Sequence, residues 1–309
     1  MNKSVRNNSF RGISYLEITV FTPTYNRAYV IKNLYESLKK QTFTDFEWIV
    51  IDDGSTDNTS DIFSEILSDE NFFPITNKKV KNGGKHRAVN QGVQIAKGRL
   101  FFIVDSDDCL PSDSLETIIK YEKNIPESDK KFFSGVAGLR GRDKNNLIGK
   151  TFEGDFIDIT HLERASHSIY GDKAESYYTE IIKRFPFPEF DGENFIMESV
   201  VWNEIGAAGL KLRYFNEVIY FCEYLEDGLT KQGTKKFEST PKGYGLYLYQ
   251  SIKYGKLKKL KKWQTILDYY YMFSKKISFF EMARNLRMNP IKLYLRIMGM
   301  KIFYKLYNR

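Results

Sequence analysis

Residues 16–57 read LEITVFTPTYNRAYVIKNLYESLKKQTFTDFEWIVIDDGSTD, and this stretch decides the fold. The apolar, β-branched runs at residues 16–21 and 46–51 are typical of buried strands. Between them, apolar side chains recur at helical spacing along residues 28–40, which predicts a helix with one apolar face. A strand, a helix and a second strand in this order predict a βαβ unit with parallel strands.

The same alternation continues along the chain. The further elements that we expect are helices at residues 59–67, 85–96, 111–123 and 193–205 and strands at residues 74–80, 100–104 and 131–139. The stretch between residues 140 and 193 is less regular. The fold class that we expect is therefore α/β, with a mostly parallel mixed sheet flanked by helices.

The length and composition indicate the number of domains and the cellular compartment that we expect for the protein. The chain has 309 residues, which suits one large domain or a domain with an appendage. Two cysteines, Cys109 and Cys222, cannot form a disulfide framework, so we expect a reducing compartment. We see no signal peptide and no run near the roughly 18 apolar residues of a membrane-spanning helix. We therefore expect a cytoplasmic protein, or a peripheral one on the inner face of the cell membrane.

The net charge of +8 hides an asymmetry along the chain. Residues 251–309 contain 15 Lys or Arg against two acidic residues, while the remaining 250 residues carry a net charge of −5. This difference predicts a mildly acidic main domain at residues 1–230 and a basic, aromatic-rich helical region at residues 231–309.

The basic region predicts docking on an anionic membrane surface, because its cations alternate with aromatic and aliphatic residues. Lys292 and Arg296 lie four residues apart, as do Lys301, Lys305 and Arg309, so each set shares a helix face. The alternative is a helical region that packs on the main domain or on a second subunit. We do not expect nucleic acid as a partner, because no recognition motif accompanies the charge. The oligomeric state stays open.

Polar residues collect directly after three of the predicted strands. TPTYNR follows the first strand at residues 22–27, DDGSTD follows the second at residues 52–57, and DSDD occupies residues 105–108. In open α/β sheets, ligands bind outside the carboxyl ends of the strands, where these loops would meet. Each run alone is also typical of a capped turn. Their occurrence on successive strand ends favours a binding site.

The chemistry of these loops points to a nucleotide diphosphate. Asp105 and Asp107 can offer hard oxygen ligands to Mg²⁺ or Mn²⁺, which would neutralise a diphosphate. NGGKHR at residues 82–87 places a flexible glycine pair before a helix start, so Lys85 and Arg87 can approach phosphates. Neither a Walker A sequence nor a GxGxxG after the first strand is present, so those two nucleotide sites are not supported.

Taken in order, these motifs resemble the family-2 glycosyltransferases of the GT-A fold. The matching pieces are TPTYNR at residues 22–27, QTFTDFE at 41–47, DDGSTDNT at 52–59, NGGKHRAVNQG at 82–92 and DSDD at 105–108. The resemblance is softer at residues 171–205 and absent from the last 70 or so residues. It implies a Rossmann-like GT-A catalytic domain at residues 1–230. It also implies a nucleotide-diphospho-sugar donor, most often a UDP-sugar, and inversion of configuration.

The resemblance also implies which residues hold the donor. The residues of the nucleotide-sugar site are Pro23, Thr24, Tyr25, Arg27, Asp52, Asp53, Lys85, Asp105 and Ser106. Tyr25 is expected to border the base, and Asp53 to hydrogen-bond it. Asp107 is expected to hold the divalent cofactor, Mn²⁺ or Mg²⁺, with Asp105 assisting.

An inverting displacement needs a general base that takes the proton of the acceptor hydroxyl. Many relatives have Glu-Asp where this chain has Glu198-Ser199. We predict Glu198 as the base, with Glu193 and Asp191 as alternatives. Another reading is that Glu198 only stabilises a helix N-terminus.

Two further residues are candidates for the acceptor side. Trp202 can stack on an acceptor sugar, or it can be a core residue at helical spacing from Glu198. Asp172 can orient acceptor hydroxyls, or it can belong to a turn next to Gly171.

The predicted function is a metal-dependent inverting glycosyltransferase that acts on a glycan or lipid-linked acceptor in bacterial surface polysaccharide or glycolipid biosynthesis. One alternative is a non-catalytic protein that binds sugar nucleotides or acts as a scaffold, which the missing Asp at position 199 keeps open. A second is a sugar nucleotidyltransferase, although such enzymes usually carry a Gly-rich basic loop after the first strand.

Overall fold

A computed structural model describes residues 16–222, 233–255 and 259–307, and its centre is an eight-stranded mixed sheet. The strands are β1 (Ile18–Thr24), β2 (Phe46–Asp52), β3 (Ile75–Lys79), β4 (Leu100–Ile103), β5 (Phe133–Gly141), β6 (Phe156–Thr160), β7 (Lys173–Tyr178) and β8 (Lys211–Phe221). Their order across the sheet is β3-β2-β1-β4-β7-β5-β8-β6. β1 pairs in parallel with β2 and β4, β2 with β3, and β5 with β8, whereas β7 is antiparallel to β4 and β5, and β6 to β8. The expected mixed, mostly parallel sheet is confirmed.

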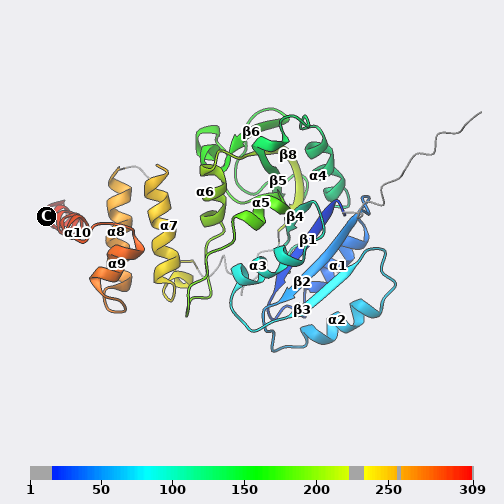
Figure 1. Cartoon of the computed structure of the whole chain (residues 1–309), viewed down its shortest axis with the longest axis horizontal. Helices are drawn as coiled ribbons and strands as arrows, with labels where there is room; N and C mark the ends of the chain where they lie inside the picture. Colours follow the sequence, from blue (N-terminus) through cyan, green and yellow to red (C-terminus); the bar gives the residue numbers. More distant parts are fainter. Residues whose placement is uncertain (1–15, 223–232, 256–258, 308–309) are drawn as a thin grey trace, which may run out of the picture.

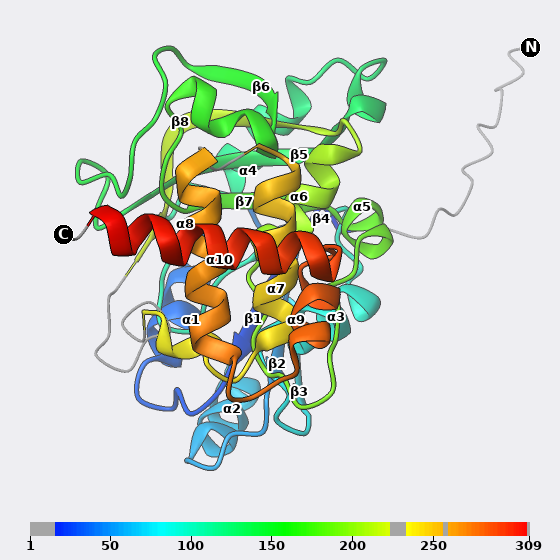
Figure 2. The same ribbon diagram turned by 90° about the vertical axis from the view of Figure 1, so that its left-hand side faces the viewer.

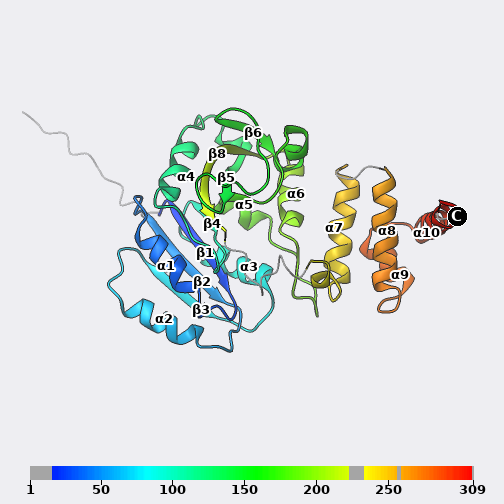
Figure 3. The ribbon, with the colours of Figure 1, turned by 180° about the vertical axis from the view of Figure 1, so that it is seen from behind.

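Helices cover both faces of this sheet (Figures 1 and 3). They are α1 (Ile31–Lys39), α2 (Thr59–Ser68), α3 (Lys85–Ile95), α4 (Ser114–Lys123), α5 (Thr179–Arg184) and α6 (Ser199–Ala207), with short 3-10 helices η1 (Lys130–Phe132), η2 (His161–His167) and η3 (Lys235–Phe237). One hydrophobic core lies under α1, α2 and α4, and a second lies under α3, α5 and α6. All residues of β1 and β2 are buried, as expected for parallel strands with helices on both faces.

The C-terminal part of the described chain is helical. Its helices are α7 (Pro241–Lys253), α8 (Lys259–Phe273), α9 (Phe279–Asn285) and α10 (Pro290–Tyr307), which share a hydrophobic core of their own. α7 packs on α6, and α10 lies outermost and crosses α8 (Figures 1 and 2). Within the described ranges, every helix is too short or too polar to cross a membrane. The expected boundary between residues 230 and 231 falls outside the described residues.

Two expectations for individual elements are corrected. The helix expected at residues 193–205 begins only at Ser199, because the backbone and side chain of Glu193 bond to α3 and α7 instead. The stretch expected to be less regular contains β6, β7 and α5, and no strand was expected where β8 lies. These strands pair with partners far away in the sequence, so local patterns carry little sign of them.

Candidate active site

The loops after β1 and β2 form one surface at the carboxyl edge of the sheet. Thr24 pairs with Asp52 at the ends of these parallel strands. Just beyond, the side-chain oxygen of Asn26 accepts hydrogen bonds from the backbone N–H groups of Thr56 (2.8 Å) and Asp57 (3.3 Å). Asn26 has a φ of 52°, a left-handed conformation that asparagine tolerates. The first two predicted polar loops therefore do meet.

Asp53 holds the glycine-containing loop that precedes α3 in place through hydrogen bonds. Its carboxylate accepts hydrogen bonds from the backbone N–H groups of Gly83 (2.7 Å) and Gly84 (2.8 Å). Gly84 has a φ of 95°, and a Cβ atom there would lie 1.8 Å from the carbonyl oxygen of Asn194. This close approach explains why the position takes glycine. The predicted contact of Asp53 with a base would compete with these hydrogen bonds.

The other predicted donor residues lie around this loop pair. Pro23 and Thr24 are buried at the end of β1, Tyr25 is 45% exposed, and Arg27 is partly buried. Thr24 Oγ1 and one carboxylate oxygen of Asp52 are buried without a hydrogen-bond partner among the described residues. Buried polar atoms are normally paired, so these two mark an edge where a polar ligand or water can bind.

Lys85 joins the end of β4 to the start of α6. Its Nζ lies 2.5 Å from Oδ1 of Asp105 and 2.8 Å from Oε1 of Glu198. Burial disfavours the ammonium charge, but the charges of Asp105 and Glu198 outweigh it and raise the pKa of Lys85. Lys85 is thus a fixed cation between a predicted metal-site residue and the predicted base.

Asp107 is the group best suited to a divalent cation. Its carboxylate makes no hydrogen bond or ion pair with another described residue, and burial together with the charge of Asp105 raises its pKa. A cation beside it would relieve both effects. No group of three or more His, Cys, Asp or Glu side chains in the described ranges can hold a metal ion. Mg²⁺ in phosphate-binding sites is typically held by one or two carboxylates plus phosphate oxygens, and Asp105 and Asp107 fit that pattern.

The neighbouring residues of the DSDD run support the site. Asp108 accepts a hydrogen bond from the hydroxyl of Tyr220 (2.7 Å), and this hydroxyl accepts one from the backbone N–H of Asp105 (2.8 Å). Ser106 is 6% exposed. Tyr220, which stands on β8, therefore fixes the backbone that presents Asp105 and Asp107.

The three candidates for the general base differ in their surroundings. Glu198 stands at the N-cap of α6 with its side chain 34% exposed beside Lys85. Glu193 is 4% exposed, and its carboxylate accepts hydrogen bonds from the backbone N–H groups of Lys242 and Gly243, both at 2.8 Å. Glu193 therefore binds the N-terminus of α7, which argues against the alternative that it is the base. Asp191 is exposed on the preceding loop.

Arg87, which was expected to approach phosphates, instead hydrogen-bonds to backbone carbonyl oxygens. Its guanidinium donates to the carbonyl oxygens of Gly83 (2.5 Å), Glu193 (2.7 Å) and Phe190 (2.7 Å). It therefore holds the glycine-containing loop against the segment that leads to Glu198. The expectation of a phosphate contact is replaced by this structural role.

The two candidates for the acceptor side also differ. Trp202 is 5% exposed and stacks on Tyr177 with ring centroids 4.3 Å apart. Its ring is therefore part of the core under α6, which was the alternative to stacking on an acceptor sugar. Asp172 is exposed next to Gly171, which has a φ of 75°, at the start of β7.

We did not predict three charged residues from the sequence, namely Arg140, Arg164 and Glu175. Arg140 at the end of β5 has its Nη1 atom 3.9 Å from Oδ2 of Asp105. Glu175 on β7 has its Oε1 atom 3.9 Å from Nη1 of Arg164 on η2. Their sequence spacing gives no signal, because only the pairing of β4, β7 and β5 brings them to one place.

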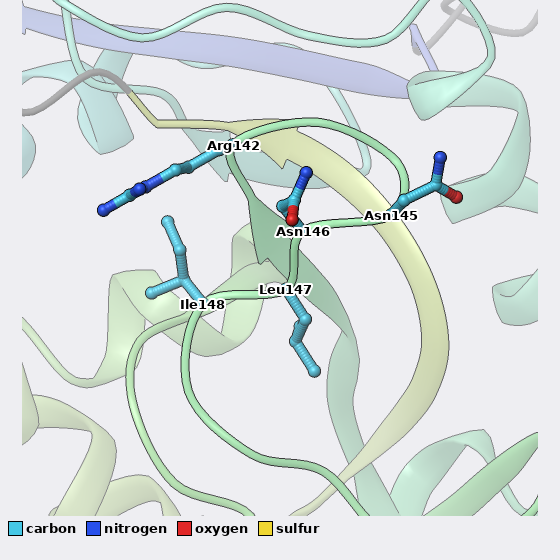
Figure 4. A pocket seen from close by; sticks show the side chains of 5 residues that line it. All are labelled: Arg142, Asn145, Asn146, Leu147 and Ile148. Carbon is cyan, nitrogen blue, oxygen red and sulfur yellow. The ribbon is translucent and has the colours of Figure 1, made fainter.

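A hollow of about 660 Å³ lies at the turn after β5. Arg142, Asn145, Asn146, Leu147 and Ile148 line it (Figure 4). The side chains of Arg142 and Ile148 lie on the same side of the turn, whereas Asn145 points to the other side (Figure 4). β5 ends at the same edge of the sheet as β4, so the turn that forms this hollow follows a strand end on the edge that carries the DSDD run.

Comparison with known proteins assigns the family. The model of the family described as Glycosyl transferase family 2 matches residues 19–129, which include Lys85, Asp105 and Asp107. Residues 19–129 therefore carry the sequence pattern of glycosyltransferase family 2. This assignment agrees with the class of enzyme that the sequence predicts, and it argues against a nucleotidyltransferase.

Two curated relatives illustrate the match to family 2. Glycosyltransferase GlyG of Streptococcus pneumoniae is 35% identical over 133 residues, which cover 39% of this chain and 44% of GlyG. The chain therefore spans less than half of the length of GlyG. The GalNAc(5)-diNAcBac-PP-undecaprenol beta-1,3-glucosyltransferase of Campylobacter jejuni is 26% identical over 261 residues, which cover 74% of this chain and 80% of the relative.

A solved structure supports the fold of this chain. The crystal structure of S. aureus TarS 1–349 in complex with UDP-GlcNAc has a TM-score of 0.57 and 21% sequence identity. The likeness covers 85% of this chain and 75% of that TarS chain. The expected GT-A fold is confirmed.

Proposed function

We propose that this family-2 member transfers a sugar from a nucleotide-diphospho-sugar to a hydroxyl group of a glycan or lipid-linked acceptor, with inversion of configuration. The observation that carries the proposal is Lys85, whose Nζ contacts Asp105 at 2.5 Å and Glu198 at 2.8 Å. Lys85 therefore contacts both Asp105, which suits the donor side, and Glu198, which suits proton transfer. A UDP-sugar is the donor that we favour, and the TarS complex with UDP-GlcNAc supports this choice.

In an inverting displacement, each charged group of the site would have a separate role. Glu198 takes the proton of the acceptor hydroxyl as the new glycosidic bond forms and the bond to the diphosphate breaks. A Mn²⁺ or Mg²⁺ ion held by Asp107, with Asp105 assisting, would neutralise the diphosphate as it leaves. Lys85 is paired with Glu198 in the donor-free protein, and phosphate oxygens offer its ammonium a competing partner. Donor binding would then leave Glu198 freer to accept a proton.

Calorimetric binding of UDP, GDP and dTDP with and without Mn²⁺ tests the donor side. We expect selective, metal-dependent binding of UDP to the wild type and at least about a tenfold loss in Asp107→Asn, because a metal-bound carboxylate is replaced by a neutral amide. The matched control is Asp113→Asn, an exposed aspartate outside the site that pairs with Lys144. If none of the three nucleotides binds the wild type, the transferase proposal is wrong.

Turnover of the preferred UDP-sugar by water tests the base in the same preparation. In Glu198→Gln we expect UDP binding to persist and turnover to fall by about 100-fold or more, the usual contribution of a general base. Asp191→Asn serves as the second arm, because Asp191 was the other open candidate and is exposed. Loss of turnover in Asp191→Asn alone would move the role of base to that residue.

For the acceptor, the hollow after β5 is the candidate site. The hollow after β5 has a polar lining of Arg142, Asn145 and Asn146, which suits the hydroxyl groups of a glycan. The name of the Campylobacter relative includes an undecaprenol-linked acceptor, which supports a lipid-linked acceptor here. We propose that the protein works in bacterial surface polysaccharide or glycolipid biosynthesis, on the cytoplasmic side of the cell membrane.

We further propose that the C-terminal helices dock on an anionic membrane surface through α10. Leu293, Ile297 and Met300 face the core shared with α8 and α9 and are at most 7% exposed. The opposite side of α10 carries an aliphatic stripe, which consists of Ile291, Leu295, Met298, Ile302 and Leu306, with exposures from 38% to 70%. These five positions follow one another at intervals of three or four residues, so they line one face of the helix.

The charges around this aliphatic stripe fit a lipid surface. Lys292 and Lys305 are exposed beside the stripe. Arg296 and Lys301 instead lie over the rings of Trp263 (4.0 Å) and Tyr270 (4.5 Å), so they contribute less to a free basic face than their spacing predicts. The expected contribution of Arg309 lies outside the described residues. Apolar side chains flanked by lysines are typical of helices that lie in a membrane interface.

A further inference from the structure

Glu175 is a carboxylate without an assigned task inside the charged network around Lys85. Its side chain is 10% exposed, and it makes no hydrogen bond with any residue that the structure describes. Its one ion-pair contact is with Arg164, at 3.9 Å. A buried carboxylate normally accepts several hydrogen bonds, so the missing donors call for an explanation.

The strand pairing places Glu175 beside the site. Its neighbour Ser176 pairs with Phe102 near the end of β4, and Asp105 follows that strand directly. Arg140 approaches Asp105 at 3.9 Å from β5, which is also the strand that pairs with β7 next to Glu175. The charges of Arg140 and Glu198 both act on Glu175, after the larger effect of its burial and that of Arg164. Glu175 therefore interacts electrostatically with Arg140, which contacts Asp105, and with the predicted base Glu198.

Other unpaired polar atoms surround the same place. Ala137 pairs with Glu175 on one side and with Tyr214 on the other, so a small side chain separates these two residues on one face of the sheet. The hydroxyl groups of Tyr177 and Tyr214 are buried and have no hydrogen-bond partner among the described residues, and the same holds for Nε of Arg164. Hydroxyl, guanidinium and carboxylate groups are the groups that bind sugar hydroxyls.

We propose that Glu175 accepts a hydrogen bond from a hydroxyl group of the sugar that is transferred, and so helps to select that sugar. This inference rests on the proposed transferase function. The transferred sugar is a better fit than the acceptor, because the side chain of Glu175 is only 10% exposed. The end of the donor can be enclosed there, whereas a glycan or lipid-linked acceptor must reach out of the site.

Comparing UDP with UDP-sugars in calorimetry isolates this contact. The probes are UDP, UDP-glucose, UDP-galactose and UDP-GlcNAc with Mn²⁺, and the quantity measured is the gain in affinity of each UDP-sugar over UDP. In Glu175→Gln we expect the affinity for UDP to stay within about twofold, while the gain for the preferred sugar falls by about tenfold or more, as for a hydrogen bond to a charged group. Glu180→Gln is the matched control, since its side chain is 82% exposed on α5.

The outcomes separate the two proposals. If the wild type binds UDP and a UDP-sugar and Glu175→Gln keeps the same gain, the role of Glu175 is wrong and the transferase proposal stands. If the wild type binds no nucleotide, both proposals fail. Glu175→Asp keeps the charge but withdraws it from the sugar, so we expect an intermediate gain. Full recovery in Glu175→Asp would indicate that charge alone, rather than a hydrogen bond, is needed.

Discussion

At the level of single residues, the burial of Glu175 predicts how the folding stability of the protein depends on pH. Burial raises the pKa of Glu175 to about 7, whereas a glutamate in an unfolded chain ionises near its ordinary value of 4.5. Between these two pH values the folded protein binds the proton more tightly than the unfolded chain does. Folding stability contributed by this group is therefore lost as the pH rises from about 4.5 to about 7.

The Glu175→Gln variant removes this loss. At about pH 8 we expect the variant to unfold at a higher temperature than the wild type, with a difference in unfolding free energy on the order of 2 kcal/mol. The gain is expected to shrink to less than about 0.5 kcal/mol near pH 4.5, where the wild-type carboxyl is protonated in the folded protein and half protonated in the unfolded chain. Thermal unfolding followed by circular dichroism at both pH values measures it. A gain that grows on acidification would contradict the assigned pKa direction.

At the level of helices and strands, Glu193 links the part of the chain that forms the sheet to the C-terminal helices. Its carboxylate accepts hydrogen bonds from the backbone N–H groups of Lys242 and Gly243 in the first turn of α7. Its carbonyl oxygen accepts a hydrogen bond from the guanidinium of Arg87 on α3. α7 also meets α6 through a buried hydrogen bond from Asn203 to Gln250 (3.1 Å). The segment that leads to Glu198 is therefore held from both sides.

Replacing Glu193 tests this role against that of a base. In Glu193→Gln we expect the free energy of unfolding to fall by about 1–2 kcal/mol, because a charge at a helix N-terminus and one acceptor oxygen are lost. UDP-sugar turnover is expected to persist at temperatures where the variant is folded. Glu180→Gln, whose side chain is 82% exposed on α5, is the control. An unchanged unfolding temperature with lost turnover would instead make Glu193 the base.

At the level of the whole molecule, the outermost helix α10 carries the surface that we propose docks on a membrane. Co-sedimentation with phosphatidylglycerol vesicles compares the wild type with a variant that carries Ile291→Ser, Leu295→Ser and Ile302→Ser in the aliphatic stripe. We expect at least about tenfold weaker binding of the variant, since each buried aliphatic side chain contributes about 1.5–3 kcal/mol. Phe72→Ser combined with Phe132→Ser is the control, because both rings are more than half exposed but lie far from α10 in the sequence.

Two results would contradict docking on lipid. Equal sedimentation of the wild type and the stripe variant would show that the aliphatic stripe is not the contact. The second result would come from analytical ultracentrifugation of the wild type and the stripe variant without lipid. A wild-type dimer that the stripe variant turns into a monomer would make the aliphatic stripe a subunit interface, the alternative that the basic region leaves open.

Much of the amino-terminal half was predictable from local sequence. Apolar runs and helical periodicity predict β1, α1 and β2, because fully buried parallel strands and amphipathic helices each have a distinct local pattern. The polar loops at the strand ends predict a site with Asp105 and Asp107, since parallel strands end at one edge of the sheet. These features depend on neighbours in sequence, so a sequence alone determines them.

Only the tertiary structure decides how the remaining side chains are used. Glu193, Glu198 and Glu175 are all acidic, yet one binds a helix N-terminus, one pairs with Lys85 and one lies buried without a hydrogen bond. Trp202 has a spacing that suits a sugar contact, and it is in the core. The physical reason is that burial, strand pairing and competing hydrogen-bond partners come from residues distant in the sequence. These surroundings set the charge, exposure and role of each group.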